Sequence, residues 1–183
     1  MSEELLVRHC SPTLAGIKTG NMFNCSFENS EKMKESIRKL NGVFAKKGLR
    51  ILPLRYRNNS ALIYVYRPSK LSQDLQDDTA CRLLEERGYA TGVPESCILH
   101  LIHRLSSSEE FPHEIGLFLG YPPEDVCGFI ENRAEGCKCV GCWKVYSDEE
   151  AAQKTFEKFK KCTTVYCEQW AKGRSIERLT VAV

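Results

Sequence analysis

The sequence predicts an α+β fold, with one domain over residues 1–183 in which several helices pack against a small mixed or antiparallel sheet. Two β-rich runs joined by a short polar turn fill residues 49–67, which is the pattern of a hairpin. On both sides of it, apolar residues recur at helical spacing. A chain of 183 residues can bury roughly two-thirds of its unfolded surface, and no linker divides it.

The N-terminal part is predicted to be helical up to the hairpin. Residues 3–9 are expected to form a short helix. Ser11 followed by Pro12 is a favoured pair for the start of a helix, so a second helix is expected from there to about Phe23. Residues 31–47 carry a further apolar stripe at helical spacing.

The predicted hairpin pairs residues 49–56 with residues 61–67. In the second run, apolar side chains point to both faces, so this strand is expected to be central and covered on both sides. Further helices are expected over residues 70–76, 79–87, 95–105, 112–119 and 123–132.

The C-terminal part is predicted to return to the sheet. Residues 138–146 read as a third strand. Ser147 and Glu150 have the spacing of a capping box, which predicts that a long helix begins there. Residues 177–183 are β-rich and are expected to form a fourth strand at a sheet edge.

Composition indicates a soluble globular protein, with 42% hydrophobic and 27% charged residues. The net charge of +2 argues against a surface dominated by nucleic-acid or anionic-lipid binding. No uncharged run approaches the ~18 residues of a membrane span, and the N-terminus lacks a secretory pattern. A cytoplasmic location is therefore expected, with neither nucleic acid nor membrane as partner. Ten cysteines there are expected to be thiols or ligands.

Four segments together resemble domain-of-unknown-function family 3793. They are residues 9–18, 64–68, 111–122 and 139–146. The resemblance extends over nearly the whole chain and implies a protein of anaerobic, mostly clostridial, bacteria. It also suggests iron or redox physiology, and it implies no activity, cofactor or partner.

Cys10 is the first candidate for a reactive group. It directly precedes the expected helix start, where the helix dipole and unpaired amides would stabilise a thiolate. A thiol nucleophile also needs a base and an orienting group. His113 with Glu114, or the adjacent His9, would supply them. The alternative is that Cys10 is a small buried core residue.

Three cations are candidates for binding an anionic ligand: Lys18, Arg67 and Lys144. Lys18 follows the Cys10 segment, and Arg67 and Lys144 lie within or beside apolar strands. Arginine suits bidentate recognition of phosphate or carboxylate groups. A cation that projects from a buried sheet needs a partner, so each is either paired structurally or faces a ligand.

Three close cysteines suggest a metal site. Cys137, Cys139 and Cys142 are spaced so that their thiolates would hold a thiophilic metal or part of an iron–sulfur cluster. On a regular strand, however, Cys142 would face away from the other two, unless Gly141 forms a bulge. Buried or incidental thiols are the alternative.

Residues 112–131 have the spacing of a helix-turn-helix, with close approach expected at Gly116 and a left-handed residue at Gly120. The exposed positions of the second helix are expected to include Glu124 and Asp125, and none of them is Arg, Lys, Asn or Gln. A DNA-reading helix needs such donors. The segment is therefore interpreted as helix packing without DNA binding.

Two functions follow from these residues. The first is a thiol-dependent enzyme or a small anionic-ligand-binding protein that uses Cys10. The alternative is a non-catalytic accessory protein of iron or redox metabolism that acts through metal-binding cysteines or a protein interface. The chain has no P-loop and no Gly-x-Gly-x-x-Gly pattern, so nucleotide binding by either route is not indicated.

Overall fold

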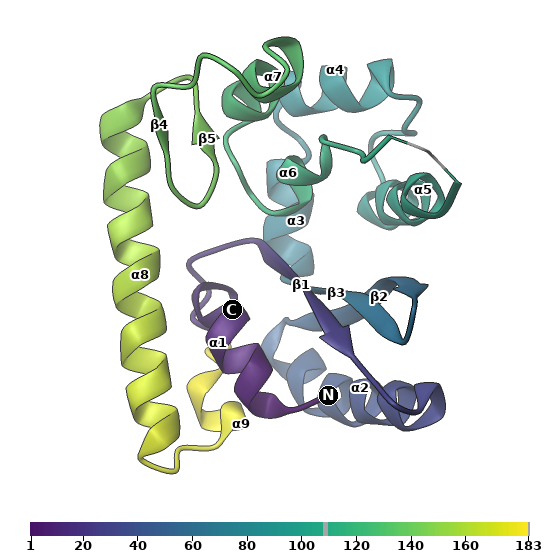
Figure 1. Cartoon of the computed structure of the whole chain (residues 1–183), viewed down its shortest axis with the longest axis vertical. Helices are drawn as coiled ribbons and strands as arrows, with labels where there is room; N and C mark the ends of the chain where they lie inside the picture. The colour runs from purple at the N-terminus through teal and green to yellow at the C-terminus, as the bar shows by residue number, and fades with distance from the viewer. Residues whose placement is uncertain (108–109, 183) are drawn as a thin grey trace. The chain divides into compact units, whose positions relative to one another are not determined.

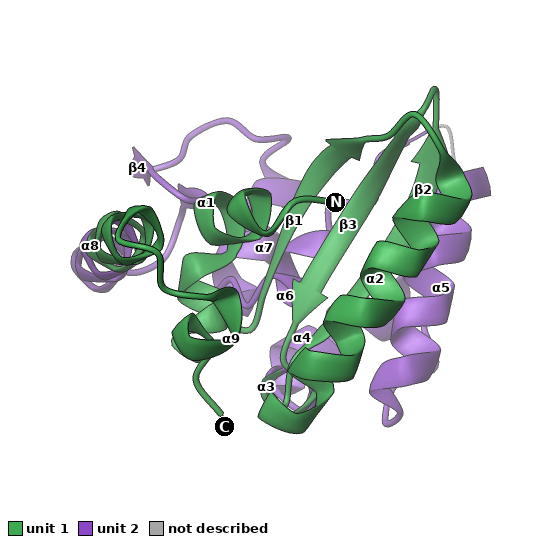
Figure 2. Ribbon diagram, turned by 90° about the horizontal axis from the view of Figure 1, so that it is seen from below, with its two compact units in different colours: residues 1–70, 161–183 green, residues 71–160 purple. Residues whose placement is uncertain are grey.

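The computed structural model describes residues 1–107 and 110–182 and confirms the α+β class (Figure 1). The chain divides into two compact units, coloured separately in Figure 2. Unit 1 comprises Met1–Lys70 with Lys161–Val183, and unit 2 comprises Leu71–Lys160. The single domain expected over residues 1–183 stays a prediction.

Unit 1 begins with one helix where the sequence predicted two. Helix α1 spans Glu3–Leu14 and continues through Pro12. A proline inside a helix removes a hydrogen bond and costs about 3 kcal/mol. Burial of nearly the whole last half of α1 offsets that cost. The expectation of a second helix up to Phe23 is wrong, because Gly20–Ser26 forms strand β1.

The sheet of unit 1 is antiparallel, in the order β1-β3-β2 (Figure 1). Strands β2 (Arg50–Arg57) and β3 (Ser60–Tyr66) form the predicted hairpin. Its two-residue turn, Asn58-Asn59, has positive φ at both positions, as a type I′ turn requires. Strand β3 is central, as the sequence predicted. Its face with Ala61, Ile63 and Val65 is buried, whereas on the other face Tyr64 is buried and Leu62 and Tyr66 are partly buried.

Helices cover one face of this sheet. Helix α2 (Ser30–Phe44) continues into a short 3₁₀ turn, η1 (Ala45–Lys47), and confirms the predicted stripe. Helix α9 (Ile176–Leu179) stands where a fourth strand was expected over residues 177–183. That expectation is wrong because Ile176 and Leu179, three positions apart on a helix, both reach the hydrophobic core. Residue 183 lies outside the described part.

Unit 2 is mostly helical. Its elements confirm the predicted helices, and they begin and end as follows: α4 (Asp78–Glu86), α5 (Pro94–Ser107), α6 (Ile115–Phe118) and α7 (Pro123–Glu131). The boundaries between the units fall within α3 (Pro68–Asp74) and α8 (Glu149–Ala171). None of the helices within residues 1–107 and 110–182 combines the length and apolarity needed for a membrane span.

The third strand predicted over residues 138–146 is instead a short hairpin. Strand β4 (Cys139–Val140) pairs with β5 (Lys144–Val145). The expected capping box at Ser147 is also wrong. The side chain of Asp148 accepts the amide of Ala151 at 3.0 Å, while the amide of Ser147 is directed to another acceptor, described below.

The largest fully buried side chain of unit 1 is Arg67. It follows strand β3, and its guanidinium donates hydrogen bonds to backbone carbonyls from three parts of the unit. These carbonyls belong to Thr13 (2.7 Å), Leu14 (2.8 Å), Lys47 (3.1 Å) and Val181 (2.8 Å). Arg67 thus joins the end of α1, the end of η1 and the C-terminal segment after α9.

We expect Arg67→Met to destabilise the protein by at least about 3 kcal/mol, because it leaves several buried carbonyls without donors. Arg67→Lys keeps the charge but loses the planar fork that reaches several acceptors at once, so it should still cost more than about 1 kcal/mol. Urea unfolding measures both changes.

The matched control is Arg57→Lys, at an exposed position at the end of the same hairpin. Its effect should stay within about 0.5 kcal/mol. Equal stabilities of Arg67→Lys and the control would contradict the role assigned to Arg67.

Candidate functional site

Cys10 does not occupy the position that made it a candidate nucleophile. It lies inside α1, with an exposed fraction of 0%, in the hydrophobic core of unit 1. Burial raises the pKa of its thiol far above the ordinary value, and the nearby charge of Lys18 offsets this only in part. The expected placement at a helix N-terminus is therefore wrong. His113 and Glu114, its expected partners, belong to unit 2.

Two of the three candidate cations serve the structure of unit 1. Lys18 is 6% exposed, and its Nζ donates to the carbonyl of Gly20. Arg67 is fully buried and directs its guanidinium at carbonyls. Burial lowers its pKa and the neighbouring Tyr166 raises it. A ligand role for Lys18 and Arg67 is therefore not favoured.

The three close cysteines are not brought together as a metal site. Cys139 is in β4, Cys142 lies in the exposed turn before β5, and Cys137 precedes both strands. Across residues 1–107 and 110–182, no group of three or more His, Cys, Asp or Glu side chains has an arrangement that would hold a metal ion. The parity argument does not apply, because residues 138–146 form a hairpin and not one regular strand.

Glu114 is a buried structural carboxylate. Its Oε1 accepts a hydrogen bond from the Tyr89 hydroxyl at 2.8 Å and lies 3.1 Å from Nε of Arg104. Burial, and next the charge of Glu114, raise the pKa of Tyr89. Glu114 thus contacts both the segment after α4 and helix α5, while its neighbour His113 is exposed and lines a cavity.

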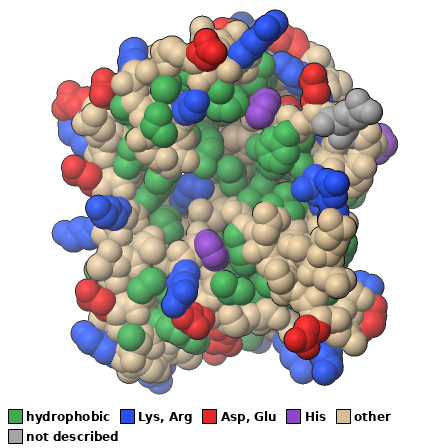
Figure 3. All heavy atoms as spheres, in the orientation of Figure 1, with side chains coloured by type: hydrophobic (Ala, Val, Ile, Leu, Met, Phe, Trp, Pro, Cys, Tyr) green, Lys and Arg blue, Asp and Glu red, His purple; other side chains and the backbone are tan. Residues whose placement is uncertain are grey.

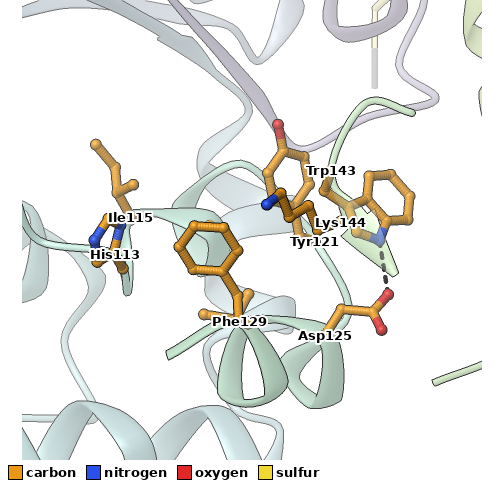
Figure 4. Close-up of a pocket in the computed structure, with 9 residues that line it drawn as sticks. His113, Ile115, Tyr121, Asp125, Phe129, Trp143 and Lys144 are labelled. Carbon is orange, nitrogen blue, oxygen red and sulfur yellow. Dashed lines mark hydrogen bonds between the residues drawn. The ribbon is translucent and has the colours of Figure 1, made fainter. Parts of the chain in front are cut away.

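That cavity, of about 170 Å³, is the candidate functional site of unit 2 (Figure 4). Aromatic rings form much of its wall, with one lysine, one histidine and one carboxylate. The residues that define its chemistry are His113, Tyr121, Asp125, Phe129, Trp143 and Lys144.

The turn between α6 and α7 brings this wall together. A Cβ added at Gly116 would lie 2.8 Å from a methyl carbon of Val126, so only glycine permits this approach of the two helices. Gly120 has φ +72°, as expected for the left-handed turn residue. The predicted helix packing is confirmed, and it places Tyr121 beside Phe129 of α7 at the cavity.

Asp125 fixes the other side of the wall. The sequence predicted it to be exposed, but it is 2% exposed. Its Oδ1 accepts the amides of Tyr146 (2.7 Å) and Ser147 (2.8 Å), and its Oδ2 accepts Nε1 of Trp143 (2.7 Å; Figure 4). Burial acts to raise the pKa of Asp125, but these hydrogen bonds outweigh it and lower the pKa below the ordinary value.

The rings are held against one another. Tyr121 and Trp143 lie 5.0 Å apart, and Trp143 meets Phe156 of α8 edge-on at 4.5 Å. His113 lies 5.0 Å from Phe129. Such contacts, together with the bond from Trp143 to Asp125, give the cavity a preformed aromatic wall.

Lys144 supplies the positive charge of the cavity. Its Nζ donates to the carbonyl of Ala134 at 2.6 Å and lies 5.9 Å from the centre of the Phe129 ring. Ala134 has φ +65°, and this left-handed turn after α7 brings its carbonyl to Lys144. An ammonium group has three donors, and one hydrogen bond leaves others for a ligand.

Sequence reasoning identified Lys144 and His113 but missed the aromatic residues around them. Trp143 stands beside Lys144 in one of the family-like segments, and Tyr121 ends another. The presence of these aromatic residues in family-like segments was the sequence signal that could have identified them as site residues. Phe129 lies in the helix-turn-helix-like segment 112–131, whose spacing predicts only helix packing, and nothing in the local pattern of Asp125 indicates that its carboxylate is buried.

The surface gives no sign of a single-charge patch on the face seen in Figure 3. There, lysine and arginine side chains are interspersed with aspartate and glutamate among hydrophobic groups. The second helix of the helix-turn-helix-like pair, α7, has Glu124 and Asp125 in its first turn. The absence of nucleic-acid binding stays a prediction.

The burial of Cys10 leads to a prediction that reverses the one made from its sequence position. With its pKa raised by burial, Cys10 should react with iodoacetamide at pH 7.5 at least tenfold more slowly than the exposed Cys142. Time-resolved alkylation with peptide mass spectrometry measures both rates in one sample. Labelling of Cys10 ahead of Cys142 would contradict its assignment to the core.

Asp125→Asn should destabilise the protein by about 1–3 kcal/mol near pH 7, since one of the three donors then faces an amide NH₂ group. Because folding lowers the pKa of Asp125, its contribution is present above the unfolded pKa of about 3.9. It is lost as pH falls through the folded value.

Urea unfolding near pH 7 and near pH 3 tests this prediction, and the stability gap between wild type and variant should narrow at the lower pH. Glu124→Gln, an exposed neighbour on the same helix, is the control and should change stability by less than about 0.5 kcal/mol. A gap that does not change with pH would contradict the prediction.

None of the curated proteins and none of the solved structures matches the chain. The family described as "Protein of unknown function (DUF3793)" matches residues 6–180, which include all of unit 2 with the whole cavity wall and most of unit 1. Since this match covers nearly the entire sequence, the chain belongs to the DUF3793 family.

Proposed function

We propose that this protein binds a small planar molecule with an anionic substituent, and that the ligand occupies the aromatic cavity of unit 2. One observation carries the proposal: the preformed wall of Tyr121, Phe129 and Trp143 beside Lys144. Aromatic walls favour planar ligands through stacking. This role agrees with the anionic-ligand binding expected from the sequence but uses a site other than Cys10. We propose that the protein acts in the cytoplasm, as the sequence predicts.

The charges of the cavity favour an anion over a cation. Aromatic cages commonly hold quaternary ammonium groups, but Lys144 would repel a cation placed beside Phe129. The carboxylate of Asp125 keeps its negative charge, but its oxygens already accept from Trp143 and two backbone amides, so a direct ion pair with a cation would have to displace these donors. The ligand is therefore neutral or negative where it meets Lys144.

The other functions expected from the sequence have less support. A thiol-dependent enzyme would need an accessible thiolate, whereas Cys10 is fully buried and its pKa is raised. An accessory role in iron or redox metabolism stays a prediction, and no arrangement among the described cysteines favours it.

Calorimetric titration with naphthalene-2-carboxylate tests the proposal, and (naphthalen-2-yl)methylammonium serves as the ligand of opposite charge. The carboxylate should bind saturably and the ammonium at least tenfold more weakly. Lys144→Met should weaken carboxylate binding at least tenfold, since a charge-assisted contact contributes about 1.5–3 kcal/mol. Phe129→Leu should weaken the binding of both ligands.

Lys138→Met is the matched control, because Lys138 is exposed, precedes the same hairpin and does not line the cavity. It should leave the affinity unchanged. Unfolding curves of each variant show that the hairpin remains folded. No saturable binding of either naphthalene derivative, or equal binding by wild type and Lys144→Met, would overturn the proposal.

A further inference from the structure

A second cavity of unit 2 shares a wall with the first. Its volume is about 620 Å³, and His113 and Phe129 line both cavities. The centre of the His113 ring lies 5.0 Å from that of Phe129 and 5.7 Å from that of Phe111. Small-molecule sites usually have volumes of about 300–1,000 Å³. The aromatic cavity alone is smaller than that, whereas the second cavity falls in the range by itself and so do the two together.

The second cavity contains two arginines. Arg87 lies at the end of α4 and Arg133 in the turn that follows α7, where φ is +50°. Within residues 1–107 and 110–182, neither guanidinium forms a hydrogen bond or ion pair. Two arginines that line one cavity supply the positive charge and the forked N–H donors with which proteins recognise a phosphate group.

Glu110 lines the same cavity. Its carboxylate would repel a phosphate placed directly beside it, but it is a good acceptor for hydroxyl groups. In dinucleotide-binding proteins, an acidic side chain accepts ribose hydroxyls in this way. The contents of the second cavity therefore suit an arm that carries hydroxyl groups and ends in a phosphate.

We infer that the ligand is a ribonucleoside monophosphate, with its base in the aromatic cavity near Trp143 and its ribose phosphate in the cavity of Arg87 and Arg133. This inference rests on the proposed function for the aromatic cavity and names the substrate class. Lys144 there meets acceptor atoms of the neutral base, and the anionic substituent is the phosphate in the second cavity. The route is unrelated to a P-loop or a Gly-x-Gly-x-x-Gly turn, neither of which the sequence contains. Stacking recognises the ring, and paired guanidinium groups recognise the phosphate.

Calorimetric titration with adenosine 5′-monophosphate, adenosine and 2′,3′-dideoxyadenosine 5′-monophosphate tests each part of this ligand. The monophosphate should bind at least tenfold more tightly than adenosine. Arg87→Gln and Arg133→Gln should each weaken the binding of the monophosphate at least fivefold and leave the affinity for adenosine unchanged. The dideoxy compound should bind several-fold more weakly, and Glu110→Gln should remove that difference.

Arg82→Gln is the control, since Arg82 is an exposed cation of α4 that lines neither cavity. Guanosine 5′-monophosphate with guanosine repeats the comparison for a second base. If naphthalene-2-carboxylate binds but phosphate gives no advantage with either base, this inference fails and the proposed function stands. If none of these compounds binds, both fail. An advantage that survives in Arg87→Gln and Arg133→Gln would overturn the assignment of the phosphate site.

Discussion

Unit 1 depends on one buried guanidinium. Arg67 gathers carbonyls from the end of α1, from η1 and from the segment after α9, which are far apart in the chain. A buried carbonyl without a hydrogen-bond donor costs free energy. Each of these three segments is therefore held in place by its hydrogen bond to the Arg67 guanidinium. The same interaction explains why a cation follows the central strand directly: its partners are the ends of the helices that cover the sheet.

In unit 2, a buried carboxylate joins separate segments in a similar way. The carboxylate of Asp125 collects two backbone amides and the indole of Trp143, and so joins α7 to the loop that carries β5. In both units a buried charge is satisfied mainly by the backbone. Such groups resemble binding residues in a sequence because they are charged and lie near apolar segments, yet their bonding capacity is used within the fold.

The candidate site combines the restrained ring of Trp143 with the less restrained side chain of Lys144. Asp125 and Phe156 restrain the ring of Trp143, which reduces the ordering that a ligand would have to impose. Lys144 is held through a single hydrogen bond to Ala134. A rigid aromatic wall beside a cation with remaining donors suits the recognition of a planar anion.

Local patterns in the sequence determined the α+β class, the hairpin, the helices from α2 to α8 and the packing of α6 against α7, because periodicity and turn residues act over a few neighbours. Only the tertiary structure decided that α1 continues through Pro12, that Gly20–Ser26 pairs with β3, and that residues 176–179 are helical. Burial of Cys10 and Asp125, and the convergence of Tyr121, Phe129 and Trp143, depend on contacts between residues distant in the chain. Those contacts arise from packing, which no single segment specifies.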